Sequence, residues 1–183
     1  MAETQAAVAT WTVDPAHSTA EFAVRHMMIS TVRGRFSGIS GQIVGDPNDW
    51  TGATAEIVID VASVDTRQPD RDKHLRSPDF FDVEKYPTIT FKSTRVVKTG
   101  QGRYEITGDL TIHGVTKSVT LQAESLGQSK DPWGGIRAGI SAETRINRKD
   151  FGLQWNQVLE TGGVLVGDEV RINVELELVR QSA

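Results

Sequence analysis

The chain alternates apolar and polar residues with a period of two over long segments. Between Thr19 and His26, the residues Ala20, Phe22 and Val24 would share one face of a strand with His26, and the residues between them would share the other. The same alternation recurs in the segments 54–61, 89–92, 104–112, 116–123, 138–146 and 170–178. One apolar and one polar face per strand predict an antiparallel sheet with one solvated side, not a parallel sheet.

Turn residues separate these segments. Glycines fall within residues 99–102 and 131–135, and His113-Gly114 predicts a tight hairpin in which His113 adopts unusual backbone angles. The pattern indicates about eight main strands and no helices alternating with them. Such a set of strands must close on itself or pair with a second sheet to protect its edges.

One segment, residues 69–78, breaks the alternation and predicts a short helix. Asp70 is the expected N-cap, and Pro78 ends the helix. Basic residues are interleaved with the carboxylates in and after this segment, which favours a solvated, self-neutralising surface over an acid–base site. These carboxylates are Asp70, Asp72, Asp79 and Asp82.

Composition excludes several classes of protein. The net charge of −4 provides no basic excess for nucleic acid, and the absence of cysteine excludes disulfides, thiolate metal sites and a cysteine nucleophile. No run approaches the ~20 apolar residues of a membrane span. Residues 1–10 have no basic residue before a weakly apolar run, so we expect a flexible leader of a cytoplasmic protein, followed by a single domain over residues 11–180.

The residues predict no catalytic group, cofactor or metal site. The four histidines lack the spacing of a metal motif, and the adjacent side chains of His17 and Ser18 would point to opposite faces. Glycines 34, 38 and 41 do not open a helix, so they favour strand coiling over phosphate binding. His26 faces inward at a strand end, which leaves two alternatives: a hydrogen-bonded core histidine or a polar contact at a cavity mouth.

Short motifs occur in order from Trp11 to the last strand. They are WTVDPAHS at 11–18, FAVRH at 22–26, VRGRF at 32–36, VDT at 64–66, RDKHL at 71–75, DFFD at 79–82, YPTITF at 86–91, GDLTIHGVTK at 108–117 and RKDFG at 148–152. This set resembles the YceI-like family of lipid and polyisoprenoid-binding proteins. The resemblance implies an all-β fold: an extended, antiparallel, eight-stranded β-barrel, lipocalin-like, with one short helix over a barrel end. It also implies that Arg71, Asp72 and His74 clamp that helix, and it is consistent with a homodimer.

The resemblance further implies a long amphiphilic lipid inside the barrel, with a role in transport, storage or stress response. We expect an isoprenoid-type ligand, either a polyprenyl phosphate or a quinone tail. The residues 27–29, Met-Met-Ile, would form an adaptable rim, and His26 and Arg33 would contact the head group. The expected ligand-binding residues are Phe22, Val24, His26, Arg33, Phe36, Ile57, Ile59, Phe91, Leu110, Leu121 and Ile140. The alternatives are an enzyme acting on a hydrophobic small molecule, with His26 as general base, and a barrel filled by its own side chains that serves in protein interaction.

Overall fold

The structure, a computed structural model, describes residues 8–156 and 165–181. Within these ranges the strands are β1 (Ala9–Val13), β2 (Thr19–His26), β3 (Ser30–Phe36), β4 (Ile39–Asp46), β5 (Asp49–Asp60), β6 (Val64–Asp65), β7 (Thr88–Gly100), β8 (Arg103–Ile112), β9 (Val115–Lys130), β10 (Ile136–Asn147) and β11 (Val166–Arg180). The helices are α1 (Pro69–Arg76) and three 3₁₀ turns, η1 (Pro15–His17), η2 (Val61–Ser63) and η3 (Arg148–Phe151). None of these helices has the length and apolar character that a membrane span requires.

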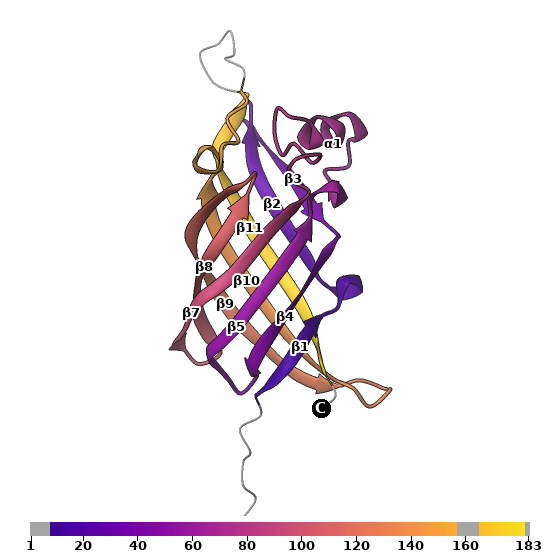
Figure 1. The fold of residues 1–183 in the computed structure, drawn as a ribbon, viewed down its shortest axis with the longest axis vertical. Coiled ribbons are helices and arrows are strands. Elements are labelled where there is room, and N and C mark those ends of the chain that lie inside the picture. The colour runs from indigo at the N-terminus through magenta and orange to yellow at the C-terminus, as the bar shows by residue number, and fades with distance from the viewer. Residues whose placement is uncertain (1–7, 157–164, 182–183) are drawn as a thin grey trace, which may run out of the picture.

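Eight strands form a closed antiparallel barrel, as the resemblance predicts (Figure 1). Their order around the ring is β1-β4-β5-β7-β8-β9-β10-β11, and β11 pairs with β1 to close it. Closure removes the exposed sheet edges that an open sheet of alternating strands would leave. The sequence had left open whether the sheet closes or pairs with a second sheet, and the structure shows closure.

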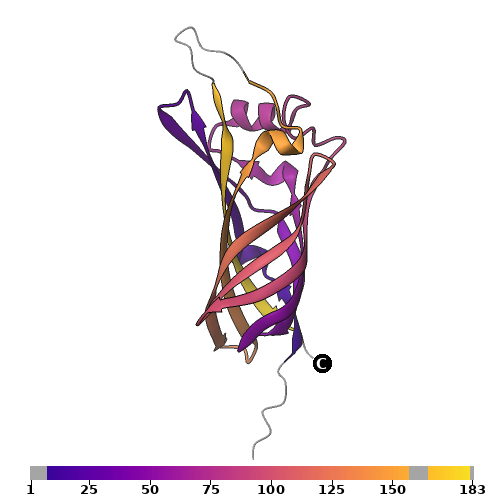
Figure 2. The same ribbon diagram turned by 90° about the vertical axis from the view of Figure 1, so that its left-hand side faces the viewer.

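β1 and β2 lie one after the other along β11. Val13 pairs with Leu178, and Thr19 pairs with Glu175. The two strands therefore follow each other along the same edge of β11, with η1 between them. β2 continues past the ring and pairs with β3, whose end pairs with the short β6. Figure 2 shows the β2–β3 hairpin leaning away from the barrel at the end that carries α1.

The predicted segments fall in strands, with small shifts at their ends. β5 stops at Asp60, and Val61 begins η2. β1 begins at Ala9, so the last residues of the expected leader belong to the sheet, while residues 1–7 lie outside the described ranges. The predicted hairpin turn is confirmed, since His113 has φ 55° and Gly114 has φ 75°.

The helix α1 lies over the open end of the barrel and is tied to the short β6 strand by polar contacts (Figure 1). The carboxylate of Asp72 accepts from the backbone N of Thr66 at 2.9 Å, and the Arg71 guanidinium donates to the backbone O of Thr66 at 2.7 Å. These contacts agree with the predicted clamp for Arg71 and Asp72, whereas His74 bonds Asp79 beyond the end of the helix. Two details of the prediction are corrected. Gln68 is the N-cap, because Pro69 occupies the first helical position, and Asp72 is buried rather than solvated.

Aromatic side chains fill the opposite end of the barrel. The backbone N of Trp50 donates to the Tyr104 hydroxyl at 3.2 Å, and the Trp11 indole donates to the backbone O of Gly45 at 3.3 Å. The rings of Trp11 and Trp50 meet edge to face, 6.1 Å apart, and both are almost fully buried. Trp11, Trp50 and Tyr104 close this end of the barrel, and we call them the aromatic floor. Any open interior therefore lies between the aromatic floor and α1.

Candidate functional site

A cavity of about 320 Å³ lies inside the barrel between the aromatic floor and α1. This volume lies within the ~300–1,000 Å³ that is typical of small-molecule sites. Because side chains alternate along a strand, the lining residues of β5, β7, β8, β9, β10 and β11 fall at alternate positions of each strand. The barrel therefore has an apolar interior that its own side chains leave partly open, which argues against the filled-barrel alternative.

Ten of the eleven expected ligand-binding residues line this cavity. They come from seven different strands, and the alternation of the sequence places all of them on the inner face. They are Phe22, Val24, His26, Phe36, Ile57, Ile59, Phe91, Leu110, Leu121 and Ile140. Their part in binding stays a prediction.

Arg33 does not line the cavity. It pairs with Ala23 across the β2–β3 ladder, and Ala23 belongs to the outer face of β2. The alternation that turns Val32 inward therefore turns Arg33 outward, where its side chain is exposed. The geometry gives no support to Arg33 as a contact for a head group buried in the cavity.

The sequence analysis missed the lining that α1 and the turns around it contribute. Phe80 and Phe81 follow α1 and reach the cavity, and Trp155 follows η3. The rings of Phe80 and Trp155 lie 5.3 Å apart, and Phe81 meets Phe36 of β3 at 5.8 Å. The signal for Phe80 and Phe81 was the pair of adjacent aromatic residues in DFFD, but no local pattern indicates what such a pair contacts.

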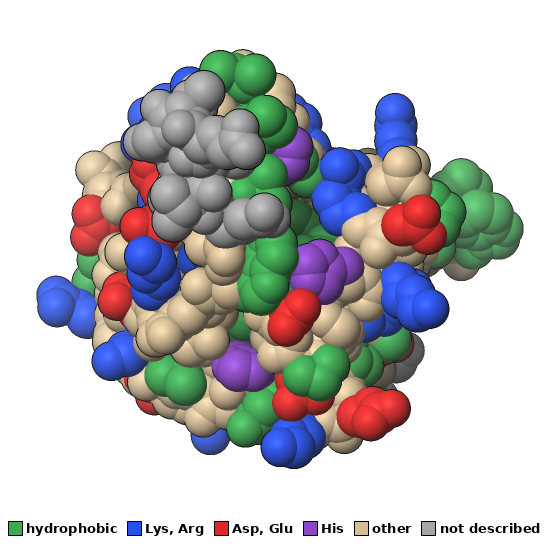
Figure 3. Space-filling model, turned by 90° about the horizontal axis from the view of Figure 1, so that it is seen from above, with side chains coloured by type: hydrophobic (Ala, Val, Ile, Leu, Met, Phe, Trp, Pro, Cys, Tyr) green, Lys and Arg blue, Asp and Glu red, His purple; other side chains and the backbone are tan. Residues whose placement is uncertain are grey.

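The charged residues that line the cavity are mostly basic. Arg71 of α1 and Arg148 of η3 contribute to the lining, and Arg25 and the single carboxylate, Glu21, border the cavity from the outer face of β2. Arg71 donates hydrogen bonds from Nε and Nη2 to Thr66. Its Nη1 has no partner among the described residues. Figure 3 looks down on this end of the molecule, and it shows hydrophobic side chains beside histidine, basic and acidic ones. The mouth therefore favours an anionic group.

Arg148 is a buried cation that holds the rim in place. Its guanidinium donates to the backbone O of Leu153 at 2.6 Å, of Trp155 at 2.9 Å and of Gly167 at 2.8 Å. Burial lowers the pKa of Arg148, and the nearest carboxylate, that of Asp168, lies 4.0 Å away. This side chain thus ties the segment after η3 to β11 and adds positive charge beside the mouth.

His26 lies at the end of β2 with its side chain half-buried at the cavity. Within the described ranges its ring forms no hydrogen bond or ion pair. A core histidine would have a partner for its buried nitrogen, so the geometry favours the alternative of a polar contact at the cavity mouth.

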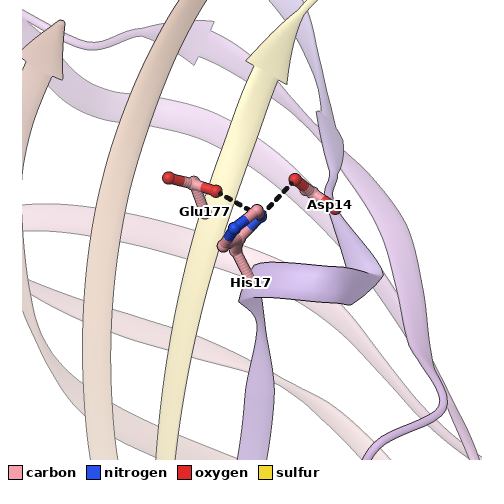
Figure 4. Close-up of side chains that lie close together, drawn as sticks. All are labelled: Asp14, His17 and Glu177. Carbon is pink, nitrogen blue, oxygen red and sulfur yellow. Dashed lines mark hydrogen bonds and ion pairs between the residues drawn. The ribbon is translucent and has the colours of Figure 1, made fainter. Parts of the chain in front are cut away.

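A separate cluster of titratable groups lies outside the barrel, where η1 meets β11 (Figure 4). His17 Nδ1 lies 2.8 Å from Asp14 Oδ2 and 3.0 Å from Glu177 Oε2. The hydrogen bond to Asp14 and the charge of Glu177 raise the pKa of His17, while His17 and Arg137 lower the pKa of Asp14 to about 2.

These three side chains offer atoms that could ligate a metal, but a cation already contacts the same oxygens. Arg137 Nη1 lies 2.8 Å from Asp14 Oδ2 and 3.2 Å from Glu177 Oε2. The buried Ser18 bonds the backbone of Glu177 instead of His17, so the two residues form no nucleophile–base pair. The arrangement is that of an ion-pair network that fastens η1 to β10 and β11.

Comparison with known proteins identifies the family of this barrel. The YceI-like domain matches residues 11–178. The chain belongs to the YceI-like family. A UPF0312 protein of Vibrio cholerae is 45% identical over 139 residues, which are 76% of this chain and 74% of that protein. A UPF0312 protein of Pseudomonas paraeruginosa is 41% identical over 165 residues, which are 90% of this chain and 83% of that protein.

Two solved structures have a fold similar to that of this chain. The crystal structure of Burkholderia cenocepacia BcnA has a TM-score of 0.79 at 28% identity, covering 90% of this chain and 98% of that one. A polyisoprenoid binding domain from Saccharophagus degradans has a TM-score of 0.72 at 18% identity, covering 97% of this chain and all of that one. At that identity the second likeness shows the fold alone.

Proposed function

We propose that this barrel binds a long-chain isoprenoid-type lipid, with the tail in the cavity and the head group at the basic mouth. The observation that carries the proposal is an apolar cavity, closed by an aromatic floor, whose mouth is lined by arginine and histidine. Membership in the YceI-like family supports a lipid-binding barrel. The similar domain from Saccharophagus degradans is named as a polyisoprenoid binding domain.

Hydrocarbon burial supplies most of the affinity. Each buried CH₂ is worth up to ~0.8 kcal/mol, so one isoprene unit contributes about 3 kcal/mol before rotor entropy is subtracted. A few units give a stable complex without a precise polar contact. The wall therefore selects for an apolar chain, and the mouth selects the head group.

The mouth favours a polyprenyl phosphate over a quinone tail. A phosphate offers charged acceptor oxygens to the free Nη1 of Arg71 and to the ring of His26, which has no other partner among the described residues. A quinone offers only neutral carbonyl oxygens, whose hydrogen bonds are weaker. We therefore assign the chain as a carrier or store of an anionic polyisoprenoid.

We further propose that the protein has no catalytic activity. An enzyme that uses His26 as general base needs a second group to orient the ring. No described carboxylate contacts it. The cavity wall is otherwise mostly aliphatic and aromatic. Its second histidine, His74, is held by Asp79 at 2.8 Å and packs edge to face against Phe80 and Trp155.

Competition between two ligands with one tail tests the head-group assignment. Delipidated protein should bind a polyprenyl phosphate at least about tenfold more tightly than the matching polyprenol, because a hydrogen bond to a charged group is worth about 1.5–3 kcal/mol. His26→Ala should reduce this preference and leave polyprenol binding unchanged. Equal affinity of the wild type for both ligands would contradict the assignment.

A further inference from the structure

The tip of the β2–β3 hairpin carries three exposed apolar residues. Met27, Met28 and Ile29 are 40%, 53% and 80% exposed. The backbone N of Ile29 donates to the backbone O of His26 at 3.2 Å, which closes a tight turn. Figure 2 shows this hairpin standing away from the barrel, and the described residues leave the side chains of the tip exposed.

The backbone of this turn does not suit methionine. Met27 has φ 53° and Met28 has φ 63°, and turns with two positive φ angles are dominated by Gly, Asn and Asp. The backbone N of Met27 donates to the backbone O of Leu165 at 2.8 Å, so the start of β11 holds the turn in this shape. Both methionines are therefore disfavoured at these positions, by the positive φ angles of the backbone and by the exposure of their apolar side chains to solvent. Such conflicts cluster at functional sites.

The same hairpin is basic. The β2–β3 hairpin contains Arg25, Arg33 and Arg35 and one acidic residue, Glu21, which pairs with Arg35 at the end of the ladder away from the tip. All three arginines are exposed, and none forms an ion pair with a described residue. Arg33 pairs with Ala23 and Arg25 with Thr31, so both arginines belong to the outer face of the ladder, close behind the tip.

We propose that this tip docks the protein onto a bilayer that contains anionic phospholipid. The apolar tip enters the boundary between head groups and acyl chains, and Arg25 and Arg33 contact lipid phosphates. The inner face of the same hairpin, with Phe22, Val24 and Val32, lines the cavity. Docking therefore brings the mouth to the surface from which a lipid would enter. The purpose of docking rests on the proposed function, but the contact itself does not.

Vesicle flotation with the delipidated full-length chain tests the contact. Wild type should float with vesicles of equal parts phosphatidylglycerol and phosphatidylcholine, and much less with phosphatidylcholine alone. The double variant Met27→Asn, Met28→Gly replaces the apolar tip with the residues that such a turn prefers, so it should fold at least as well. It should bind the mixed vesicles about tenfold or more weakly, and Arg25→Gln about fivefold more weakly.

A matched control lies at the other end of the barrel, where Trp133 is 85% exposed in the β9–β10 loop. Trp133→Ser should float like the wild type. Equal binding by the wild type and the double variant would overturn the proposal, and so would loss of binding in Trp133→Ser alone. A wild-type dimer that becomes a monomer in the double variant, with no vesicle binding by either, would show that the tip contacts a second copy instead. Failure to recover an isoprenoid from the cavity would leave the flotation result standing, so the two proposals fail separately.

Discussion

The ring of Phe22 occupies the space in which a side chain at Gly34 would stand. The two residues pair across β2 and β3, and a Cβ added at Gly34 would lie 2.3 Å from Cζ of Phe22. Phe91 covers Gly108 in the same way between β7 and β8, although it pairs with Leu110, and a Cβ added at Gly108 would lie 2.5 Å from Cζ of Phe91. Both phenylalanines line the cavity. A glycine on the neighbouring strand therefore sets how far each ring extends into the barrel.

Gly34→Ala should destabilise the fold by about 1–3 kcal/mol, because the added methyl group has to displace the Phe22 ring. Urea unfolding measures this change. Gly100→Ala is the control, since its Cβ would meet nothing closer than 3.8 Å, and it should change the free energy of unfolding by no more than about 0.5 kcal/mol. Equal stability of the two variants would show that the ring has room to move.

Val24→Asp should abolish uptake of a labelled isoprenoid. The change places a carboxylate in the apolar wall, where desolvation or protonation costs several kcal/mol. Val58→Asp makes the same change on the outer face of β5, where the side chain is 37% exposed, and should bind normally. Uptake is compared on variants whose circular dichroism shows the native β-structure. Normal uptake by folded Val24→Asp would mean that the ligand lies elsewhere.

Arg148→Met should lower the free energy of unfolding by at least about 2 kcal/mol, because it leaves several buried carbonyl groups without a donor. Arg145, near the end of β10 and three residues before Arg148, is the control, since it is exposed and its guanidinium lies 3.4 Å from a carboxylate oxygen of Glu169. Arg145→Met should cost less than about 1 kcal/mol. Comparable unfolding midpoints for the two variants would refute the bracing role of Arg148.

The ion-pair network at η1 predicts a pH dependence of stability. The raised pKa of His17 means that protonated His17 stabilises the fold below its ordinary value of 6.5, and that this contribution is lost as the pH rises through the folded pKa. Asp14 acts in the opposite sense. Its contribution to the stability of the fold is present above pH 3.8, the ordinary pKa of an aspartate, and is lost as the pH falls toward the folded pKa of about 2. Arg137 and Glu177 are the other charged groups that face this pair.

His17→Asn should therefore destabilise the protein more at about pH 5.5 than at about pH 8.5. Urea unfolding of both proteins at each pH gives the two differences. His113→Asn serves as the control, because Asn tolerates the positive φ of that turn and His113 has no carboxylate partner among the described residues. The same loss at both pH values would mean that His17 stabilises the corner without its charge.

Local patterns were enough to predict most of the cavity wall. Alternation assigns each residue to one face of a strand, and this was sufficient to predict that Phe22 and Val24 point into the barrel. The same rule turns Arg33 outward, and the expectation that it contacts a head group ignored this. Turn chemistry likewise predicted His113 and Gly114.

Contacts between distant segments carried no local signal. Arg148 is buried because the carbonyl groups of Leu153 and Gly167 converge on it, and Arg137 joins Asp14 across 123 residues of sequence. Neither follows from periodicity, because the first depends on how η3 packs against β11 and the second on the register of β10 against β11. The cytoplasmic location, the homodimer, the absence of nucleic-acid binding and the single-domain boundaries stay predictions.

Organic extraction of the purified full-length chain, followed by mass spectrometry, tests the ligand most directly. Wild type should release a polyisoprenoid with an acidic head group, in an amount that approaches one molecule per chain. Val24→Asp protein, purified in parallel and shown to be folded, should release none. A wild-type extract without isoprenoid, from protein that also fails to take up polyprenyl phosphate, would contradict the assignment of this barrel as a polyisoprenoid carrier.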